Sequence, residues 1–340
     1  MASKFPQRKI GDDLVSTIGL GCMGMSIPNS KGLPDEDECL KVLTLAADLG
    51  INFWDTSDVY GNNEQILGRW FKETGRRDEI FLATKFGNKR VDGKHFIIGT
   101  PEYVKEACDK SLKDLGVDRI DLYYQHRVDP KVPIEKTVGA MAELVKEGKV
   151  RYLGLSECSA RTLERACQVH PIAAAQMEFS PFALEIETDE TNFLKTARNL
   201  GVKIVPYSPL GRGFLTGTIK SRADFDPADM RLTMHPRFSE ENFPHNLKLV
   251  EEMMAFAKEK GCTPGQLALA WVLAQGDDFI PIPGTKTVKY LKENAGAVDV
   301  TLSKDDEKRI REAVDAAGGR KGSRYPESFM ASTFGDTPEL

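Results

Sequence analysis

Apolar residues recur at helical spacing in several segments of the chain, and each segment ends at a glycine followed by a short apolar run. In the first segment, the apolar positions between Cys39 and Leu49 fall on one helix face, and Gly50 precedes the run 51–54. The same order returns before the apolar runs 120–125, 150–155 and 202–206. Glycine readily closes a helix in the left-handed conformation, so the pattern predicts helices that turn directly into strands.

Four further apolar runs bring the expected strands to eight, and they cover 17–21, 80–86, 172–177 and 279–282. Apolar strands that alternate with helices are typical of a parallel sheet covered by helices. Eight such units in an unbroken series predict an α/β fold, a closed (β/α)8 TIM barrel. An N-terminal β-hairpin around 9–15 and two extra helices, near 246–260 and 303–315, are expected as additions.

No linker-like change of composition divides the chain, so residues 1–340 are expected to form a single domain. The stretch 208–243 holds several Pro and Gly residues and little periodicity, which predicts a long ordered loop with a function. Residues 316–340 are mostly small and polar, which predicts a tail or loop over the active-site face.

The composition excludes several classes of protein. Lys and Arg total 46 against 51 Asp and Glu, which leaves a net charge of −5 and no basic footprint for nucleic-acid binding. No apolar run approaches the ~18 residues of a membrane helix, and the N-terminus lacks the apolar stretch of a secretory signal. The six cysteines are scattered and are expected to be reduced thiols. We therefore expect a cytoplasmic protein without a metal site, and the oligomeric state stays open.

Gly19, Gly21 and Gly24 match the G-x-G-x-x-G pattern of dinucleotide-binding folds. That pattern needs a helix directly after the strand, but the segment after Gly24 carries Pro28 and Pro34. Because proline interrupts a helix, the glycines are interpreted as a tight turn at a strand end. The context excludes a Rossmann fold.

Polar residues gather where the second, third and fourth strands end. Asp55 and Tyr60 follow the second strand, Lys85 ends the third, and His126 follows the fourth. Each residue alone has an ordinary structural explanation, such as a turn former or a solvated lysine. Catalytic groups of a barrel project from the carboxyl ends of several strands, so we expect the four side chains to meet in one cleft.

These four side chains suit the reduction of a carbonyl group. A phenol has a pKa of about 10, and a nearby ammonium lowers that pKa by stabilising the phenolate. Asp55 would hold the Lys85 ammonium beside Tyr60, while His126 would orient a carbonyl oxygen. None of them can deliver a hydride, so the hypothesis requires a nicotinamide cofactor. An aldolase with a Schiff base at Lys85 is an alternative, in which the phenol and imidazole would lack a role.

The chain resembles the aldo-keto reductase superfamily along nearly its whole length. The resemblance rests on the motifs FWDTSDVYG (53–61), GKVRYLGLS (148–156), PYSPLGRGFLT (206–216) and IPGT (282–285). The sequence YYQHR (123–127) is similar to the fungal, plant and bacterial branch of NADP-dependent aldehyde reductases. The resemblance implies a barrel that binds NADP(H) without a Rossmann domain. It also implies that Tyr60 is the proton donor, that Lys85 and Asp55 assist it, and that His126 orients the substrate.

The resemblance further implies a set of cofactor contacts. The nicotinamide end would be met by Ser156, Gln176 and Tyr207. The pyrophosphate would be crossed by the loop that contains Ser208, Leu210, Gly211, Gly213 and Leu215. The adenosine end would be held by Gly284, Thr285, Lys286, Glu293 and Asn294. Many relatives carry Asn where this chain has Glu157 and Arg where it has Tyr290, so Lys286, with Lys289, would supply the charge for the 2′-phosphate.

The expected substrate is a small aldehyde or ketone with an apolar or aromatic body. Its contacts are expected to come from the loops, at Cys22, Met23, Met25, Arg127, Arg324 and Tyr325. Some relatives are auxiliary subunits of potassium channels, so a nucleotide-sensing regulatory subunit is a further alternative. The complete set of four polar residues favours an enzyme.

Overall fold

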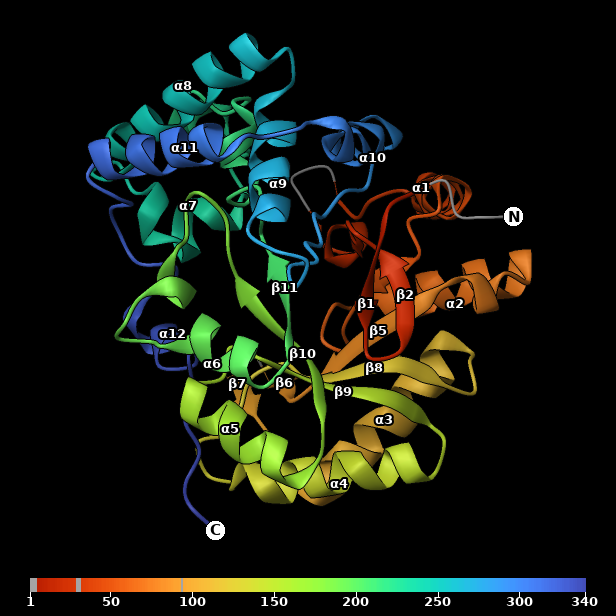
Figure 1. Cartoon of the computed structure of the whole chain (residues 1–340). Coiled ribbons are helices and arrows are strands. Elements are labelled where there is room, and N and C mark those ends of the chain that lie inside the picture. The colour runs from red at the N-terminus through yellow and green to blue at the C-terminus, as the bar shows by residue number, and fades with distance from the viewer. Residues whose placement is uncertain (1–4, 29–31, 93) are drawn as a thin grey trace.

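A curved parallel sheet forms the centre of the computed structural model, which describes residues 5–28, 32–92 and 94–340 (Figure 1). Its seven strands follow the order β11-β10-β9-β8-β5-β4-β3, and every neighbouring pair is parallel. The strands are β3 (Leu20–Gly21), β4 (Phe53–Asp55), β5 (Phe81–Phe86), β8 (Ile120–Gln125), β9 (Val150–Ser156), β10 (Ile172–Glu178) and β11 (Lys203–Tyr207). The strand predicted at 17–21 is thus shorter than expected.

The eighth position of the barrel is filled by residues 279–284, which do not form the regular strand predicted at 279–282. Single parallel bridges join Phe279 to β11 and Gly284 to β3. The reason is the alternation of Ile and Pro in this segment. The N–H groups of Ile280 and Ile282 donate to β11 at 2.9 and 3.0 Å. Pro281 and Pro283 have no N–H and can only accept, from Gly19 and Gly21 of the first-strand segment. The (β/α)8 barrel is nevertheless closed.

Helices surround the sheet, as the alternation predicts (Figure 1). The ring consists of α1 (Glu36–Leu49), α2 (Asn63–Thr74), α3 (Pro101–Leu115), α4 (Ile134–Lys146), α5 (Ala160–Val169), α6 (Phe193–Asn199), α9 (Pro264–Ala274) and α10 (Val288–Ala295). The two predicted extra helices are α8 (Phe243–Lys260) and α11 (Lys304–Ala316), which lie together outside the ring. Gly50 ends α1 at φ 82°, the left-handed conformation expected of it.

The predicted N-terminal hairpin consists of β1 (Gln7–Ile10) and β2 (Asp13–Ser16). It closes the amino-terminal end of the barrel, because Ile10 and Val15 pack with Phe53 and Leu122 in the barrel interior. The Arg8 guanidinium binds the carbonyl oxygens of Leu273 and Phe279. The interior is therefore sealed at this end.

Several segments cover the carboxyl ends of the strands. A second hairpin, β6 (Asn88–Val91) with β7 (Lys94–Ile97), follows β5 and was not predicted. The predicted loop 208–243 contains only short helices, which are η4 (Phe214–Thr216), η5 (Arg222–Asp224), α7 (Met230–Met234) and η6 (Pro236–Phe238). The C-terminal tail, which includes α12 (Glu327–Met330), pairs Gly335 with the residues just after β9. The tail thus lies beside the carboxyl end of β9.

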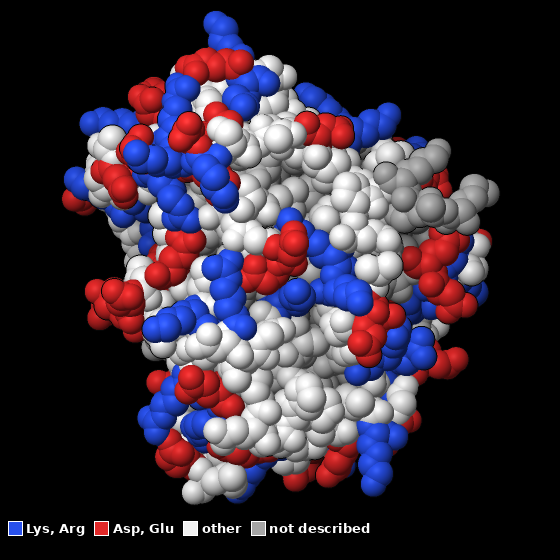
Figure 2. All heavy atoms as spheres, in the orientation of Figure 1, with Lys and Arg blue, Asp and Glu red and all other residues white. Residues whose placement is uncertain are grey.

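The surface seen in Figure 2 carries Lys and Arg interleaved with Asp and Glu, without an extended field of one sign. Within the described residues, no helix is long and apolar enough to cross a bilayer, and no group of His, Cys, Asp or Glu is arranged to hold a metal ion.

Candidate active site

The period-two alternation of the strands brings the predicted polar residues to the carboxyl-terminal end of the barrel interior. Phe81 and Ala83 of β5 pack inside the barrel, so Lys85, two residues further on, faces the same interior. Phe53 and Asp55 have the same relation on β4, and Tyr124 of β8 has it with His126, which directly follows β8. The barrel interior is therefore apolar at its centre and polar toward the carboxyl ends of the strands.

Lys85 and Asp55 form a buried ion pair at the base of this polar region. The Lys85 ammonium donates to Asp55 Oδ1 and, at 2.7 Å, to the carbonyl oxygen of Thr56. Gln176 Nε2 donates to the other carboxylate oxygen of Asp55 at 2.8 Å. Burial alone lowers the pKa of Lys85, but Asp55 and then Tyr60 outweigh it, and the net pKa lies above its ordinary value. Lys85 is therefore a fixed positive charge.

Tyr60 and His126 lie directly above this pair. The Lys85 ammonium is 5.2 Å from the centre of the Tyr60 ring, and the Tyr60 and His126 rings meet edge-to-face with centroids 5.7 Å apart. The loop that carries Tyr60 is held by Ser26, whose hydroxyl donates to the Tyr60 carbonyl oxygen at 2.5 Å. All four predicted side chains thus meet, although they come from three strands and a loop.

The pKa of Tyr60 is shifted in the opposite direction to the one predicted. Burial raises the pKa of Tyr60, and the opposing effect of Lys85 does not overcome it. The predicted net lowering of this pKa was therefore wrong, because the sequence does not show how deeply the phenol is buried. Burial, followed by Lys85 and Arg127, holds the pKa of His126 well below its usual range. At neutral pH the site has a protonated phenol and a neutral imidazole.

The residues expected at a nicotinamide lie beside this group. Ser156 is buried and faces Arg127 Nη1 at 3.4 Å. Gln176 already gives its Nε2 to Asp55, so its Oε1 is the atom left for a carboxamide. Tyr207 is oriented by its hydroxyl, which donates to Glu157 Oε1 at 2.9 Å. These positions fit a flat polar ring bound above the ion pair.

The loop after β11 has the backbone and the charge to hold an anion. Ser208 and Arg212 have φ of 50° and 58°, and Gly211 and Gly213 have 57° and 85°, so the chain winds tightly here. The Arg212 guanidinium donates to Tyr325 Oη at 2.8 Å. Within the described part of the chain it pairs with no carboxylate, and its Nε is buried without a hydrogen-bond partner. Leu210 and Leu215 close the same turn through a backbone hydrogen bond of 3.1 Å. A pyrophosphate fits this unpaired cation.

The residues expected at the adenosine end lie on the far side of the first strand. Gly284 pairs with Gly21 of β3, and Thr285 accepts from the Thr287 N–H at 3.1 Å. Lys286 follows them, half-buried and without an ion pair among the described residues. On α10, Asn294 is buried and Glu293 accepts from the Thr263 hydroxyl at 2.8 Å. The predicted groups are thus brought to one region from separate parts of the chain.

The six residues expected to contact substrate are not equally placed for it. Cys22 and Met25 are fully buried in the main core, whereas Met23 is 41% exposed. Arg127 and Tyr325 are half-buried, and both act electrostatically on Tyr60. Arg324 is fully buried and donates to Glu157 Oε1 at 2.8 Å, which favours a structural role. Met23, Arg127 and Tyr325 therefore have the better placement for a substrate.

The sequence did not reveal the buried ionic network beneath the tail. Glu157 accepts from Tyr207 and Arg324, and Glu178 accepts from Arg237 Nη2 at 2.6 Å. The nearby arginines, mainly Arg237, hold the pKa of Glu178 at about 2 against the opposing effect of burial. One signal was available, because Glu178 lies two residues after Gln176 and therefore on the same inward face of β10. Its partners lie in loops and could not be read from any local pattern.

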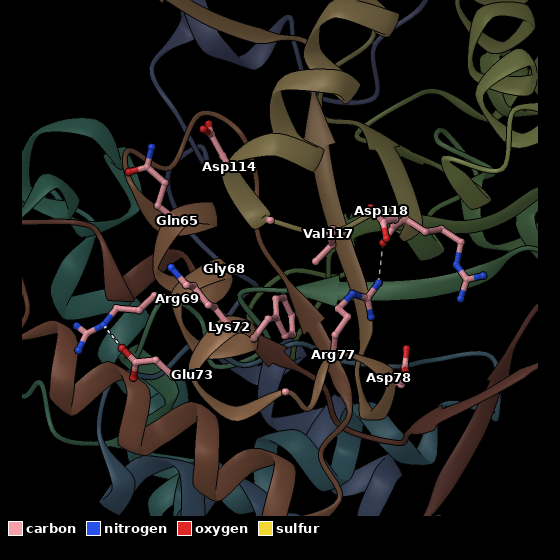
Figure 3. Close-up of a pocket in the computed structure, with 14 residues that line it drawn as sticks. Gln65, Gly68, Arg69, Lys72, Glu73, Arg77, Asp78, Asp114, Val117 and Asp118 are labelled. Atoms are coloured by element: carbon pink, nitrogen blue, oxygen red, sulfur yellow. Dashed lines mark hydrogen bonds and ion pairs between the residues drawn. The ribbon is translucent and has the colours of Figure 1, made fainter.

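A groove of about 1010 Å³ lies elsewhere on the molecule, between the ends of α2 and α3 (Figure 3). Its lining includes residues that precede β5 and β8, such as Arg77 and Arg119, so it is at the amino-terminal end of the barrel. Its charges are largely paired, as Figure 3 shows for Arg69 and Glu73 at 2.7 Å. No histidine or cysteine lines this groove, so it is a weaker candidate for an active site than the barrel interior.

Comparison with known proteins agrees with this geometry. A model of the Aldo/keto reductase family matches residues 17–315. The chain is 52% identical to the aldo-keto reductase str7 of Strobilurus tenacellus over 98% of both chains. It is also 52% identical to the aldo-keto reductase yakc of Schizosaccharomyces pombe, whose name specifies NADP(+), again over 98% of both. A solved glycerol dehydrogenase from Gluconobacter oxydans superposes with a TM-score of 0.83 at 28% identity, covering 95% of this chain and 98% of its own.

Proposed function

This chain belongs to the aldo/keto reductase family, whose members are oxidoreductases that act on carbonyl groups, and we propose that it reduces aldehydes or ketones to alcohols with NADPH. The observation that supports this most directly is the buried Lys85–Asp55 pair below Tyr60, with the neutral imidazole of His126 against the phenol. The name of the yakc relative supports the choice of cofactor.

Each residue has a defined task in the proposed reaction. NADPH supplies the hydride. His126 donates a hydrogen bond to the carbonyl oxygen, polarises it and fixes its orientation. Tyr60 gives its proton to that oxygen as charge develops there. Burial keeps the phenol protonated before this step, and the Lys85 ammonium opposes the rise in its pKa. Lys85 stabilises the phenolate that remains, and Asp55 with Gln176 holds the ammonium in place.

The cofactor would be held by residues that keep a hydrogen-bonding atom or a positive charge available for it. Gln176 Oε1 and Ser156 would bind the carboxamide, and Tyr207 would stack on the ring. Arg212 and the tight turn around it would meet the pyrophosphate. Lys286, which has no ion pair among the described residues, would meet the 2′-phosphate.

The geometry disfavours the two alternatives. A Schiff-base lysine must lose its proton to attack a carbonyl, but the pKa of Lys85 is raised and its ammonium is bound to Asp55. A regulatory subunit that only senses nucleotide has no need for a phenol, an ammonium and an imidazole in contact. We therefore keep carbonyl reduction as the proposal.

Tyr60→Phe tests it directly. Removal of the general acid should lower kcat/KM for 4-nitrobenzaldehyde by about 10²- to 10⁴-fold, measured as NADPH oxidation. Quenching of tryptophan fluorescence by NADPH should persist, because the phenol is not proposed to bind the cofactor. The matched control is Tyr152→Phe, which removes a phenol at the closed end of the barrel, where it accepts from the Asp12 N–H. Equal activity in wild type and Tyr60→Phe would disprove the assigned acid.

A further inference from the structure

Ser57 connects the imidazole of His126 to a carboxyl group that the proposed mechanism does not use. The Ser57 hydroxyl lies 3.1 Å from His126 Nδ1. The same oxygen lies 3.3 Å from Asp58 Oδ1 and 3.3 Å from the carbonyl oxygen of Lys85. Ser57 is fully buried, so water does not compete for these contacts. Among the described residues, none bonds the other ring nitrogen, Nε2.

The number of protons on Ser57 and His126 determines which nitrogen of His126 can donate a hydrogen bond. A neutral imidazole carries one proton, and a serine hydroxyl donates one. If Ser57 donates to Nδ1, the imidazole proton is on Nε2, which can then donate to a carbonyl oxygen. If Ser57 donates to Asp58, it accepts from an Nδ1–H group. Nε2 is then only an acceptor, and it suits the hydroxyl of an alcohol rather than a carbonyl.

The ionisation state of Asp58 would select between these two directions of hydrogen bonding through Ser57. It is half-buried, and within the described residues it forms no ion pair. Burial and then the neighbouring Glu64 raise its pKa to about 7. The titratable groups that face it from the surrounding elements are Glu64 of α2, Tyr103 and Lys110 of α3, Lys85 of β5 and Tyr123 of β8. Lys110 and Lys85 favour the ionised carboxyl, but they do not outweigh burial and Glu64.

We propose that Ser57 and Asp58 are positioning residues that set which nitrogen of His126 carries the proton, so that ionisation of Asp58 removes the Nε2–H donor on which carbonyl reduction depends. A protonated Asp58 donates to Ser57, which donates to Nδ1 and leaves Nε2–H facing the substrate. An ionised Asp58 accepts a hydrogen bond from the Ser57 hydroxyl, which then accepts from Nδ1–H of His126. The effect of the tautomer on catalysis rests on the proposed carbonyl reduction, whereas the change of tautomer with pH does not.

The decisive measurement is the tautomer of His126 in the full chain. Histidine labelled with ¹⁵N reports Nδ1–H and Nε2–H separately, and His126 is identified among the five histidines by its absence in His126→Asn. In the wild type we expect Nε2–H at pH 5.5 and Nδ1–H at pH above about 8, with a midpoint near that of Asp58. In Asp58→Asn the side chain does not titrate, so the tautomer of His126 should be the same at every pH.

Two further variants sharpen the test. Glu64→Gln removes the charge that opposes ionisation of Asp58, so the midpoint should move to lower pH. Ser57→Ala removes the link, so the tautomer should no longer follow Asp58. In the wild type, kcat/KM for aldehyde reduction should fall by up to about 10²-fold as Nε2–H is lost, and Asp58→Asn should lack that decrease. If Ser57→Ala does not fold, the pH dependence of the His126 tautomer in the wild type and in Asp58→Asn is sufficient to test the proposal.

The proposal is overturned if the wild-type tautomer is constant with pH, as it would be if Ser57 always donated to the Lys85 carbonyl. It is also overturned if Asp58→Asn shows the same midpoint as the wild type. The NMR signal is read without turnover, so these results are distinct from a failure of the proposed function. That failure would instead appear as equal activity in Tyr60→Phe.

Discussion

The buried pair between Arg324 and Glu157 allows a quantitative prediction. Arg324 lies in the C-terminal tail and Glu157 follows β9, and both side chains are essentially excluded from solvent. Glu157 also accepts from the hydroxyl of Tyr207 at 2.9 Å and from the N–H of Glu178 at 3.2 Å. Arg324→Met keeps a side chain about as long as the aliphatic part of arginine but removes the charged guanidinium, so it leaves a buried carboxylate with neutral donors only.

The cost of that substitution can be worked out from the burial. Breaking a buried ion pair by removal of one partner costs about 3–5 kcal/mol. The entropy of unfolding is about 2.1 cal/mol/K per residue, so this cost lowers the Tm of a 340-residue chain by roughly 4–7 °C. Glu157→Gln in the Arg324→Met background removes the stranded charge. The double variant should recover about 1–3 kcal/mol as coupling energy, but not all, because Arg324 also lies 3.7 Å from Glu178.

Urea unfolding of the wild type, both single variants and the double variant measures this coupling. The matched control is Arg309→Met, which breaks an exposed pair with Glu259 and should leave the urea midpoint unchanged. In Glu157→Gln the Tyr207 hydroxyl donates to a neutral amide oxygen in place of a carboxylate, so weaker NADPH binding should accompany that variant. A coupling energy of zero, with Arg324→Met as stable as the control, would refute the assignment of this pair as a structural tie between tail and barrel.

Two further predictions concern stability. Gly11→Ala should cost about 1–2 kcal/mol for its left-handed backbone alone, and more because its Cβ would lie 2.2 Å from the Tyr152 ring; Gly75→Ala, with φ of 69° and open space, isolates the backbone part, and equal losses would contradict the predicted clash. Burial lowers the pKa of His235 to about 4, so the unfolded chain binds a proton that the folded chain does not, and stability should fall as pH decreases from about 6.5 to 4. Urea midpoints across that range should fall less steeply in His235→Gln, and an unchanged slope would contradict this.

Local patterns were sufficient for much of the fold. The predicted strand 120–125 is β8 itself, because a buried parallel strand is a continuous apolar run. The segment 279–284 departs from its prediction, since the effect of Pro281 and Pro283 depends on which neighbours donate to it. The second hairpin was missed although Asp92-Gly93 is a recognised turn signal between its strands.

Strand alternation and the parallel direction of the strands can be read from local patterns, and they bring Asp55, Lys85 and His126 to one end of a barrel. The charge states and hydrogen-bond partners of these residues depend on how distant segments pack around them. The pKa of Tyr60 depends on burial by segments distant in the chain, and Arg324 is 167 residues from Glu157. Periodicity reports which face a residue occupies, but the depth of burial and the identity of a partner depend on the packing of the whole chain.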